Sequence, residues 1–258
     1  QLGRTTHQTL ARDEYVPVAE IISELRRWLK QDGQADYITL AGSGEPTLNT
    51  QFGEIIDFVH KNCDIPVALL TNGTLLGDPV VRHAAAGADL VKVSLSAWDQ
   101  SSLERVNRPA PAITFTSLLA GIKGFRAQST GQLWLEVFLI PGINSRAGDV
   151  ARIAELVREL APARVQLNTA VRPPAEPWVH PLPTAIMTRL AGLFEPLAEV
   201  VGEFAEAYSA AVQATEQRVL ALLRRRPCTA QQIAGNFGMH FNEVSKYIVR
   251  LLHTRQIK

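Results

Sequence analysis

Four residues, Gly42-Ser43-Gly44-Glu45, combine two glycines with a carboxylate directly after a short apolar run. Glycines let a ligand approach the backbone closely because no Cβ is in the way, and a neighbouring carboxylate can hold an ammonium group. The same run could instead be a tight turn in which Glu45 caps the following helix. Taken alone, these residues leave both interpretations open.

Similar polar runs follow four further apolar segments of the chain. They are Thr71-Asn72-Gly73-Thr74, Ser94-Leu95-Ser96, Pro141-Gly142-Ile143-Asn144 and Asn168-Thr169. Hydroxyl and amide groups donate and accept hydrogen bonds, so side chains of this kind can bind a polar ligand. Asn72, Ser94 and Asn168 could equally cap loops or helix starts by bonding to the backbone.

Each polar run ends an expected strand and comes before an expected helix. Strands are expected at residues 37–41, 66–70, 90–95, 133–140 and 164–167, with a further short strand at 199–204. Helices are expected at residues 17–29, 52–59, 79–86, 114–126, 149–160 and 184–194, where apolar residues recur with the helical period or a proline or threonine starts the turn. This alternation predicts an α/β fold with a parallel sheet and right-handed crossovers. The carboxyl ends of parallel strands form the active face of such folds, so the five polar strand ends predict one ligand site.

The end of the chain differs from the rest in charge and pattern. From Gln213 onward eight basic residues face two acidic ones, so this tail carries about +6 and the remainder about −5 of the total +1. Helices are expected around Val219, from Thr229 and around Val244, with Gly238 between the last two, which is the helix-turn-helix pattern. Lys246 and Arg250 on the third helix could contact nucleic-acid phosphates, although such modules also dock proteins.

The strand-end motifs together resemble those of radical S-adenosylmethionine (SAM) enzymes, and more narrowly the iron–sulfur oxidoreductases related to the wybutosine tRNA-modifying enzymes. The resemblance runs in order through residues 38–49, 70–76, 91–96, 105–109, 136–144 and 165–174, and covers roughly residues 36 to 174. It implies a partial (β/α)6 TIM-like barrel whose first strand is missing, followed by a small all-α winged helix-turn-helix domain. The expected domains are residues 1–204, a linker at 205–214, and residues 215–258 with a truncated wing.

The resemblance also implies a cofactor and a role for individual residues. Relatives hold a [4Fe–4S] cluster with three cysteines spaced C-x3-C-x2-C, and SAM chelates the fourth iron and is cleaved to a 5′-deoxyadenosyl radical. Gly44 and Glu45 would bind the methionyl amino group. Asn72, Ser94 and Ser96 lie where the family places contacts to the carboxylate and ribose. Asn144, Asn168 and Val171 lie near the ribose or adenine end.

The cysteines of this chain depart from the family pattern. Only Cys63 and Cys228 are present, and they are too far apart in sequence to form a metal-binding knuckle. Thiolates are the ligands that hold iron–sulfur clusters, so this chain as given cannot assemble one. Residues 1–6 resemble those that follow the third cysteine in relatives, so we expect a fragment whose cluster ligands lie upstream.

The resulting hypothesis is a radical SAM oxidoreductase that acts on an unknown substrate and takes electrons from an external donor such as flavodoxin or ferredoxin. One alternative is an RNA-modifying or DNA-associated protein that uses the tail. Another is a non-catalytic SAM-binding sensor with a DNA-binding tail. No apolar run reaches the roughly 20 residues that span a bilayer, and no secretory signal is present, so a cytoplasmic protein with no membrane partner is expected.

Overall fold

The computed structural model describes residues 8–31, 33–42, 44–170, 176, 178–201, 216–224, 229–237, 239, 241–254 and 256–257 of the 258-residue chain. The chain divides into two compact units, Gln1–Gly202 and Glu203–Lys258. The expected linker at 205–214 lies outside the described residues.

The first unit is built on one parallel sheet with its strands in sequence order, β1-β2-β3-β4-β5-β6. The strands are β1 (Ile38–Leu40), β2 (Val67–Thr71), β3 (Leu90–Ser94), β4 (Gln132–Phe138), β5 (Arg164–Asn168) and β6 (Glu199–Val200). Every neighbouring pair is parallel. The predicted α/β fold with a parallel sheet is confirmed, and β6 supplies the short strand that was expected near residue 199.

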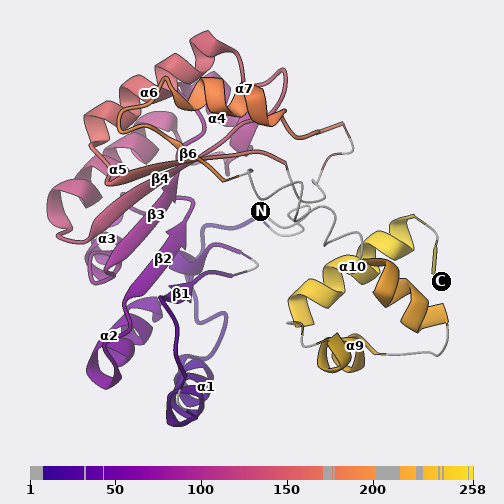
Figure 1. Ribbon diagram of the computed structural model, residues 1–258. Coiled ribbons are helices and arrows are strands. Elements are labelled where there is room, and N and C mark those ends of the chain that lie inside the picture. Colours follow the sequence, from indigo (N-terminus) through magenta and orange to yellow (C-terminus); the bar gives the residue numbers. More distant parts are fainter. Residues whose placement is uncertain are drawn as a thin grey trace. The chain divides into compact units, whose positions relative to one another are not determined.

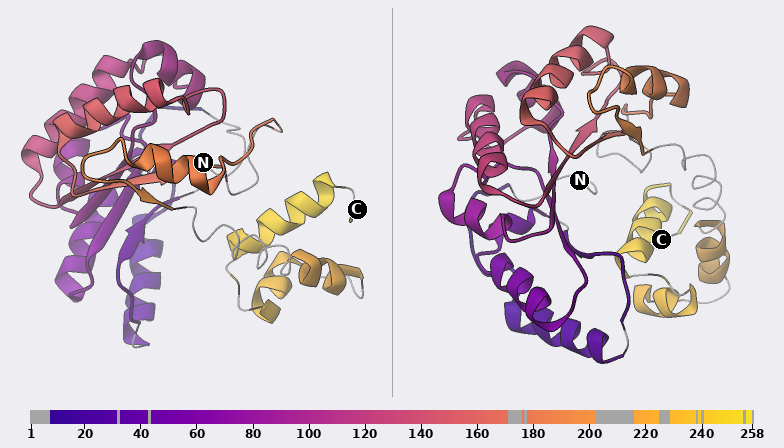
Figure 2. Two further views of the ribbon diagram at one scale, coloured as in Figure 1. Left: turned by 45° about the horizontal axis from the view of Figure 1, so that its top comes forward. Right: turned by 60° about the vertical axis from the view of Figure 1, so that its left-hand side comes forward.

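Helices connect these strands. They are α1 (Val18–Lys30), the 3-10 turn η1 (Pro46–Leu48), α2 (Phe52–Asn62), α3 (Pro79–Ala85), α4 (Gln100–Asn107), α5 (Phe115–Gln128), α6 (Ala147–Leu160) and α7 (Thr184–Ala191). Helices α2, α3, α5 and α6 lie along the same face of the sheet (Figures 1 and 2). Right-handed crossovers carry successive helices to one face, as in barrel folds.

Alternation along each strand separates two faces of the sheet. Val91, Val93, Leu135, Val137 and Leu167 are fully buried in the core that the helices cover. Burying such a side chain contributes about 1.5–3 kcal/mol, so this face carries most of the stabilisation of the unit. The alternate residues point to the opposite, inner face, where polar residues such as Lys92, Glu136 and Gln166 are partly exposed.

Helix α4 is the element that the sequence did not indicate. Only Leu103 and Val106 are apolar within it, which is too few for a clear helical period. Leu103 is buried in the core, and at the start of the helix the Asp99 carboxylate accepts from the Ser102 N–H while the Ser102 hydroxyl accepts from the Asp99 N–H. This capping box satisfies backbone donors that would otherwise lack partners.

One close contact fixes the loop after β2. Helix α5 carries Gly121, and a Cβ at that position would lie 2.7 Å from the backbone nitrogen of Gly77 and 2.9 Å from the carbonyl carbon of Leu76. Only glycine lets the helix backbone approach the loop this closely. Helix α5 therefore holds the segment that begins with the Thr71-Asn72-Gly73 motif.

The second unit contains three helical segments, namely residues 216–224, α9 (Ala230–Phe237) and α10 (Phe241–His253). Val219, Leu220, Ile233, Val244 and Leu251 form its buried core. Thr229 caps α9 as expected, since its hydroxyl accepts from the Gln232 N–H at 3.2 Å. The helices lie where the sequence predicted them, and Gly238 lies outside the described residues. The winged-helix assignment stays a prediction.

Candidate functional site

The polar strand ends of the first unit meet at one edge of the sheet because all six strands are parallel. Gly42 and Gly44 follow β1, Asn72 follows β2, Ser94 ends β3 and Asn168 ends β5. The register places Thr71 beside Val93 and Phe138 beside Asn168, so the predicted residues of β2 to β5 line a continuous edge. The structure thus brings together the residues that the sequence singled out after separate strands.

Glu45 is the most strongly held side chain at this edge. Its Oε1 accepts from the hydroxyl of Thr71 at 2.6 Å, from the hydroxyl of Thr47 at 2.7 Å and from the Thr47 N–H at 3.2 Å. Its Oε2 accepts from the Asn72 N–H at 2.7 Å. Glu45 therefore caps the start of η1, which was one of the two interpretations of the sequence. Its carboxylate also links the ends of β1 and β2. Its Oε2 keeps capacity for a further donor, because a carboxylate offers about four acceptor positions.

The surroundings of Gly44 differ from those of Gly73, a glycine in the motif that follows β2. Gly73 has φ +78°, and a Cβ there would lie 2.8 Å from the Val93 side chain. Gly44 has no left-handed φ, and a Cβ built on it meets nothing within 4 Å. Neither the backbone conformation nor the described neighbours of position 44 require a glycine there, and the space beside this exposed residue is open.

Asn72 and Asn168 each use one side-chain atom for local structure. The Asn72 Oδ1 accepts from the N–H and the hydroxyl of Thr74, at 2.9 and 2.7 Å. The Asn168 Oδ1 accepts from the Thr169 N–H at 2.8 Å. These are the loop-capping bonds that the sequence allowed as an alternative. Within the described part of the chain, the Nδ2 of both residues and the hydroxyl of Ser94 make no hydrogen bond, so they can serve a ligand.

Ser96 and Asn144 take part in a buried network instead. The Asn144 side chain has no exposed area; its Oδ1 accepts from the Ile140 N–H, and its Nδ2 donates to the carbonyls of Ser96 and Phe138. The Ser96 hydroxyl is 3% exposed and accepts from the Phe138 N–H at 2.8 Å. In this arrangement both side chains hold the ends of β3 and β4 together. A ligand contact by the Asn144 amide would require these bonds to break, whereas the Ser96 hydroxyl only accepts in this network and could still donate its proton.

Three threonines at this edge were missed by the sequence reasoning. Thr47 and Thr71 hold Glu45, and Thr169 donates its hydroxyl to the Leu139 carbonyl while accepting from the Leu182 N–H. All three are at most 4% exposed. A buried hydroxyl must find partners, so a threonine at the end of an apolar strand was the available signal. Val171 lies outside the described residues.

The residues of this chain do not fit a [4Fe–4S] cluster. A cluster takes three or four thiolates, whereas the sequence contains only Cys63 and Cys228. Cys63 is a free thiol whose Sγ lies 3.6 Å from the Val59 carbonyl, and Cys228 lies outside the described residues. Over the described ranges no group of three potential metal ligands occurs.

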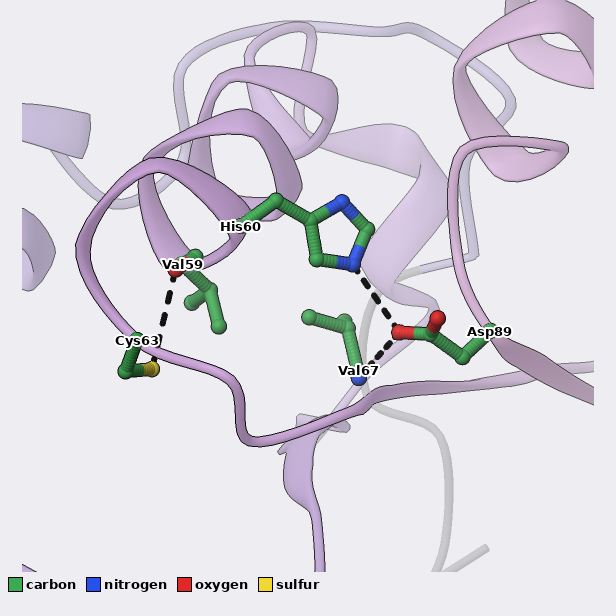
Figure 3. Close-up of polar contacts among 5 residues, drawn as sticks. All are labelled: Val59, His60, Cys63, Val67 and Asp89. Carbon is green, nitrogen blue, oxygen red and sulfur yellow. Dashed lines mark hydrogen bonds and ion pairs between the residues drawn. The ribbon is translucent and has the colours of Figure 1, made fainter.

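At the opposite edge of the sheet, where the strands begin, a histidine and an aspartate side chain are in contact. His60 on α2 lies 2.9 Å from the Asp89 carboxylate, which also accepts from the Val67 N–H at 2.7 Å (Figure 3). Partial burial alone would raise the pKa of Asp89, but the Val67 N–H and His60 outweigh it and lower this pKa below its ordinary value. Residues at this end of a parallel barrel serve stability.

The two predicted nucleic-acid contacts on α10 are in different surroundings. The Arg250 Nε lies 3.2 Å from the Glu216 carboxylate, so its charge is partly compensated. No described residue pairs with Lys246, which is half-buried. Phosphate binding by either residue stays a prediction. None of the helices that the structure describes combines the length and apolar composition needed to cross a membrane.

Comparison with known proteins places these features in a family. The model of the Radical SAM superfamily matches residues 4–157. The chain is 32% identical to a GTPase Obg of Brachyspira hyodysenteriae over its whole length, but this match covers 38% of that relative. It is 31% identical to a UPF0026 protein of Helicobacter pylori strain J99, over 85% of this chain and 72% of that protein.

Among solved structures, TYW1 with a lysine-pyruvate adduct bound is similar with a TM-score of 0.52, over 70% of this chain and 57% of that chain. The two sequences are 19% identical, so this likeness shows the fold alone. It agrees with a partial TIM-like barrel in the first unit. The chain spans less than two thirds of the Obg relative and of the TYW1 structure.

Proposed function

Because the chain belongs to the radical SAM superfamily, we propose that the polar edge of its sheet binds SAM and that the whole protein is an iron–sulfur enzyme using it. The observation that carries the proposal is the Glu45 carboxylate, which four donors from η1, the end of β2 and the residue after it hold beside the open backbone of Gly44. A carboxylate fixed in this way can receive an ammonium group without first reorganising.

The available atoms at the edge suit the different parts of SAM. The Gly44 backbone and the Glu45 Oε2 would receive the methionyl ammonium. The Asn72 Nδ2 and the Ser94 hydroxyl would bind the carboxylate and ribose, and the Asn168 Nδ2 would bind the ribose or adenine end. A role for Val171 at that end stays a prediction. Ser96 and Asn144 would act indirectly, by holding the strand ends that carry these contacts.

SAM, when bound and reductively cleaved, supplies a 5′-deoxyadenosyl radical that removes hydrogen from a substrate. This chain's residues would bind and orient the cofactor at the sheet edge, while the iron–sulfur cluster needs thiolates that its sequence does not contain. Oxidoreductase chemistry, an external electron donor, a cytoplasmic location and kinship with the wybutosine-related group belong to the same proposal. RNA modification, DNA association and ligand sensing stay predictions.

Substitution at Gly44 tests the SAM site. The added methyl of Gly44→Ala meets no protein atom, so we expect an unchanged unfolding midpoint but at least tenfold weaker SAM binding in equilibrium dialysis. Gly148→Ala is the matched control, because a Cβ at this exposed position in the first turn of α6 also meets nothing within 4 Å. Equal SAM affinity of Gly44→Ala and the unchanged chain would reject the site.

Catalysis requires the whole protein, prepared anaerobically from a reading frame that supplies the cluster cysteines. We expect reductive cleavage of SAM to methionine and 5′-deoxyadenosine, measured by chromatography after addition of dithionite. SAM binding together with a reducible cluster but no 5′-deoxyadenosine would reject the enzyme and favour the sensor.

A further inference from the structure

Two opposite charges lie close together on the inner face of the sheet. Lys92 on β3 and Glu136 on β4 form an ion pair with 2.7 Å between Nζ and Oε2. The Lys92 Nζ also lies 3.4 Å from the Oε1 of Gln166 on β5. Three neighbouring strands thus contribute one polar group each to a single place.

Strand alternation puts this cluster on the face that the helices leave open. Val91, Val93 and Leu135 point into the helix-covered core, whereas Lys92 and Glu136 point the other way and are 22% and 23% exposed. Ser94 follows Lys92 on the same face and belongs to the proposed SAM edge. Lys92 lies two residues before Ser94 on β3, and Glu136 is the register partner of Ser94 on β4, so the pair adjoins the proposed SAM site.

Stability gives little reason for charges at this position. Removing two charges from water costs free energy that the attraction between them often does not repay. Apolar residues of similar size can often replace such a pair without loss of stability. The pair also keeps unused bonding capacity. The Lys92 ammonium has three protons and donates to two acceptors, Glu136 and Gln166. Among the described residues the Glu136 Oε1 has no hydrogen-bond partner.

We propose that Lys92 and Glu136 bind the zwitterionic group of an α-amino acid as the substrate of the enzyme proposed above, on which this inference rests. The substrate carboxylate would accept from Lys92 and its ammonium would donate to Glu136, so that adjacent opposite charges pair head to tail. The Lys92–Glu136 pair is neutral overall, and Arg164 beside Trp134 is itself paired with Glu199. The described residues around the pair therefore offer no uncompensated positive charge for a dianionic phosphate.

The residues beside the pair suggest an apolar side chain on this amino acid. Leu70 on β2 and Trp134 on β4 are the register neighbours of Lys92 on its two sides, and both are partly exposed on the same face. The Arg164 guanidinium lies over the Trp134 ring at 4.8 Å from its centroid. The Leu70 side chain and the remaining carbon surface of Trp134 can cover an aliphatic group next to the bound zwitterion. L-leucine combines the two features and serves as the probe.

Binding of L-leucine to the full chain, measured by calorimetry or saturation-transfer NMR, tests the inference. The analogues 4-methylpentanoate and isoamylamine each lack one charge and should bind at least tenfold more weakly, and inorganic phosphate should not compete. The double variant Lys92→Met/Glu136→Gln removes both charges together, and we expect at least a tenfold loss of L-leucine affinity with SAM affinity unchanged.

Lys123→Met/Glu159→Gln is the matched control, because this exposed surface pair has the same 2.7 Å separation and should leave L-leucine binding unchanged. Absence of L-leucine binding, equal binding of the analogues, or unchanged affinity in the Lys92/Glu136 variant would overturn the inference. The analogue comparison uses the unaltered chain and so does not depend on the variant folding. Loss of L-leucine binding in Gly44→Ala would place the ligand at the SAM edge instead, whereas failure of SAM binding alone would reject only the proposed function.

Discussion

At the scale of single residues, the candidate site depends on hydrogen bonds that prepare a few atoms for a ligand. Glu45 and Asn72 each make loop-capping bonds and still keep an atom available, so the capping and binding interpretations of these residues are compatible. Asn144 has no side-chain atom available for a ligand, because it is fully buried and its amide oxygen and nitrogen already make three hydrogen bonds. Burial thus separates residues that can contact a ligand from those that position others.

Thr71→Val should weaken both the fold and the site. The hydroxyl donates to Glu45 and accepts from the buried Gly73 N–H, so the isosteric valine leaves that N–H without a partner. We expect a loss of about 1–3 kcal/mol in the free energy of unfolding, measured by urea denaturation, together with weaker SAM binding. Thr188→Val on the exposed side of α7 is the control and should change stability by less than about 0.5 kcal/mol. Equal effects of the two variants would contradict the role of Thr71.

Asp89 should make stability depend on pH. Its pKa is lowered in the folded chain, so its contribution is present above the ordinary value of about 3.9 and is lost as pH falls through the folded value. We expect Asp89→Asn to lower the free energy of unfolding by about 1 kcal/mol at pH 7, since the pair is half exposed. The difference from the unaltered chain should shrink below pH 4 in urea titrations. Asp64→Asn, an exposed carboxylate nearby, should show no such difference at any pH.

At the scale of elements, the strands and most helices followed from the sequence, because buried parallel strands read as apolar runs between glycine and asparagine turns. Helix α4 did not, because it has only two apolar residues and the capping box at its start involves a serine and an aspartate, which are common in loops. The Ser96–Asn144 bond and the Lys92–Glu136 pair were also out of reach, since they join residues 48 and 44 positions apart. Predicting such contacts requires the strand register, which a single sequence does not fix.

Helix α4 should depend on Asp99. Removing the cap with Asp99→Ala should cost about 1 kcal/mol, whereas Asp99→Asn can still accept from the Ser102 N–H and should cost less. The Ser102 N–H lowers the pKa of Asp99, so the advantage of the carboxylate over alanine should diminish as pH falls below about 4. Urea denaturation of the three proteins at pH 7 and pH 3 measures this. Identical losses for both variants at pH 7 would contradict the capping role.

At the scale of the whole molecule, charge divides the chain into an acidic part and a tail of about +6 from Gln213 onward. If the tail contacts phosphates, binding of the full chain to random duplex DNA should weaken steeply between 50 and 200 mM salt. Lys246→Ala should reduce the slope of log affinity against log salt by about 1, measured by fluorescence anisotropy. Arg250→Ala should change it less, because Glu216 already compensates Arg250.

The acidic part supplies the control for this experiment. Lys123→Ala removes an exposed charge from the first unit, and we expect it to leave the salt dependence unchanged. An unaltered slope in Lys246→Ala, or no DNA binding at 50 mM salt, would count against nucleic acid as the partner. The helical tail would then be examined as a protein-docking module.

The sequential order of the strands has a consequence for how this chain acquires its structure. Each strand pairs with the strand made just before it, and the paired residues, such as Ala68 and Leu90 or Leu90 and Gln132, lie 22 to 42 positions apart. A ribosome delivers the chain from its N-terminus. Every new strand can therefore pair with the exposed side of the preceding strand as soon as it and its crossover helix have emerged. The longest closure, between β3 and β4, costs only about 0.6 kcal/mol more than the shortest, because loop entropy grows with the logarithm of length. The sheet can thus grow by adding each new strand beside the one before it, without waiting for a segment that is distant in the sequence.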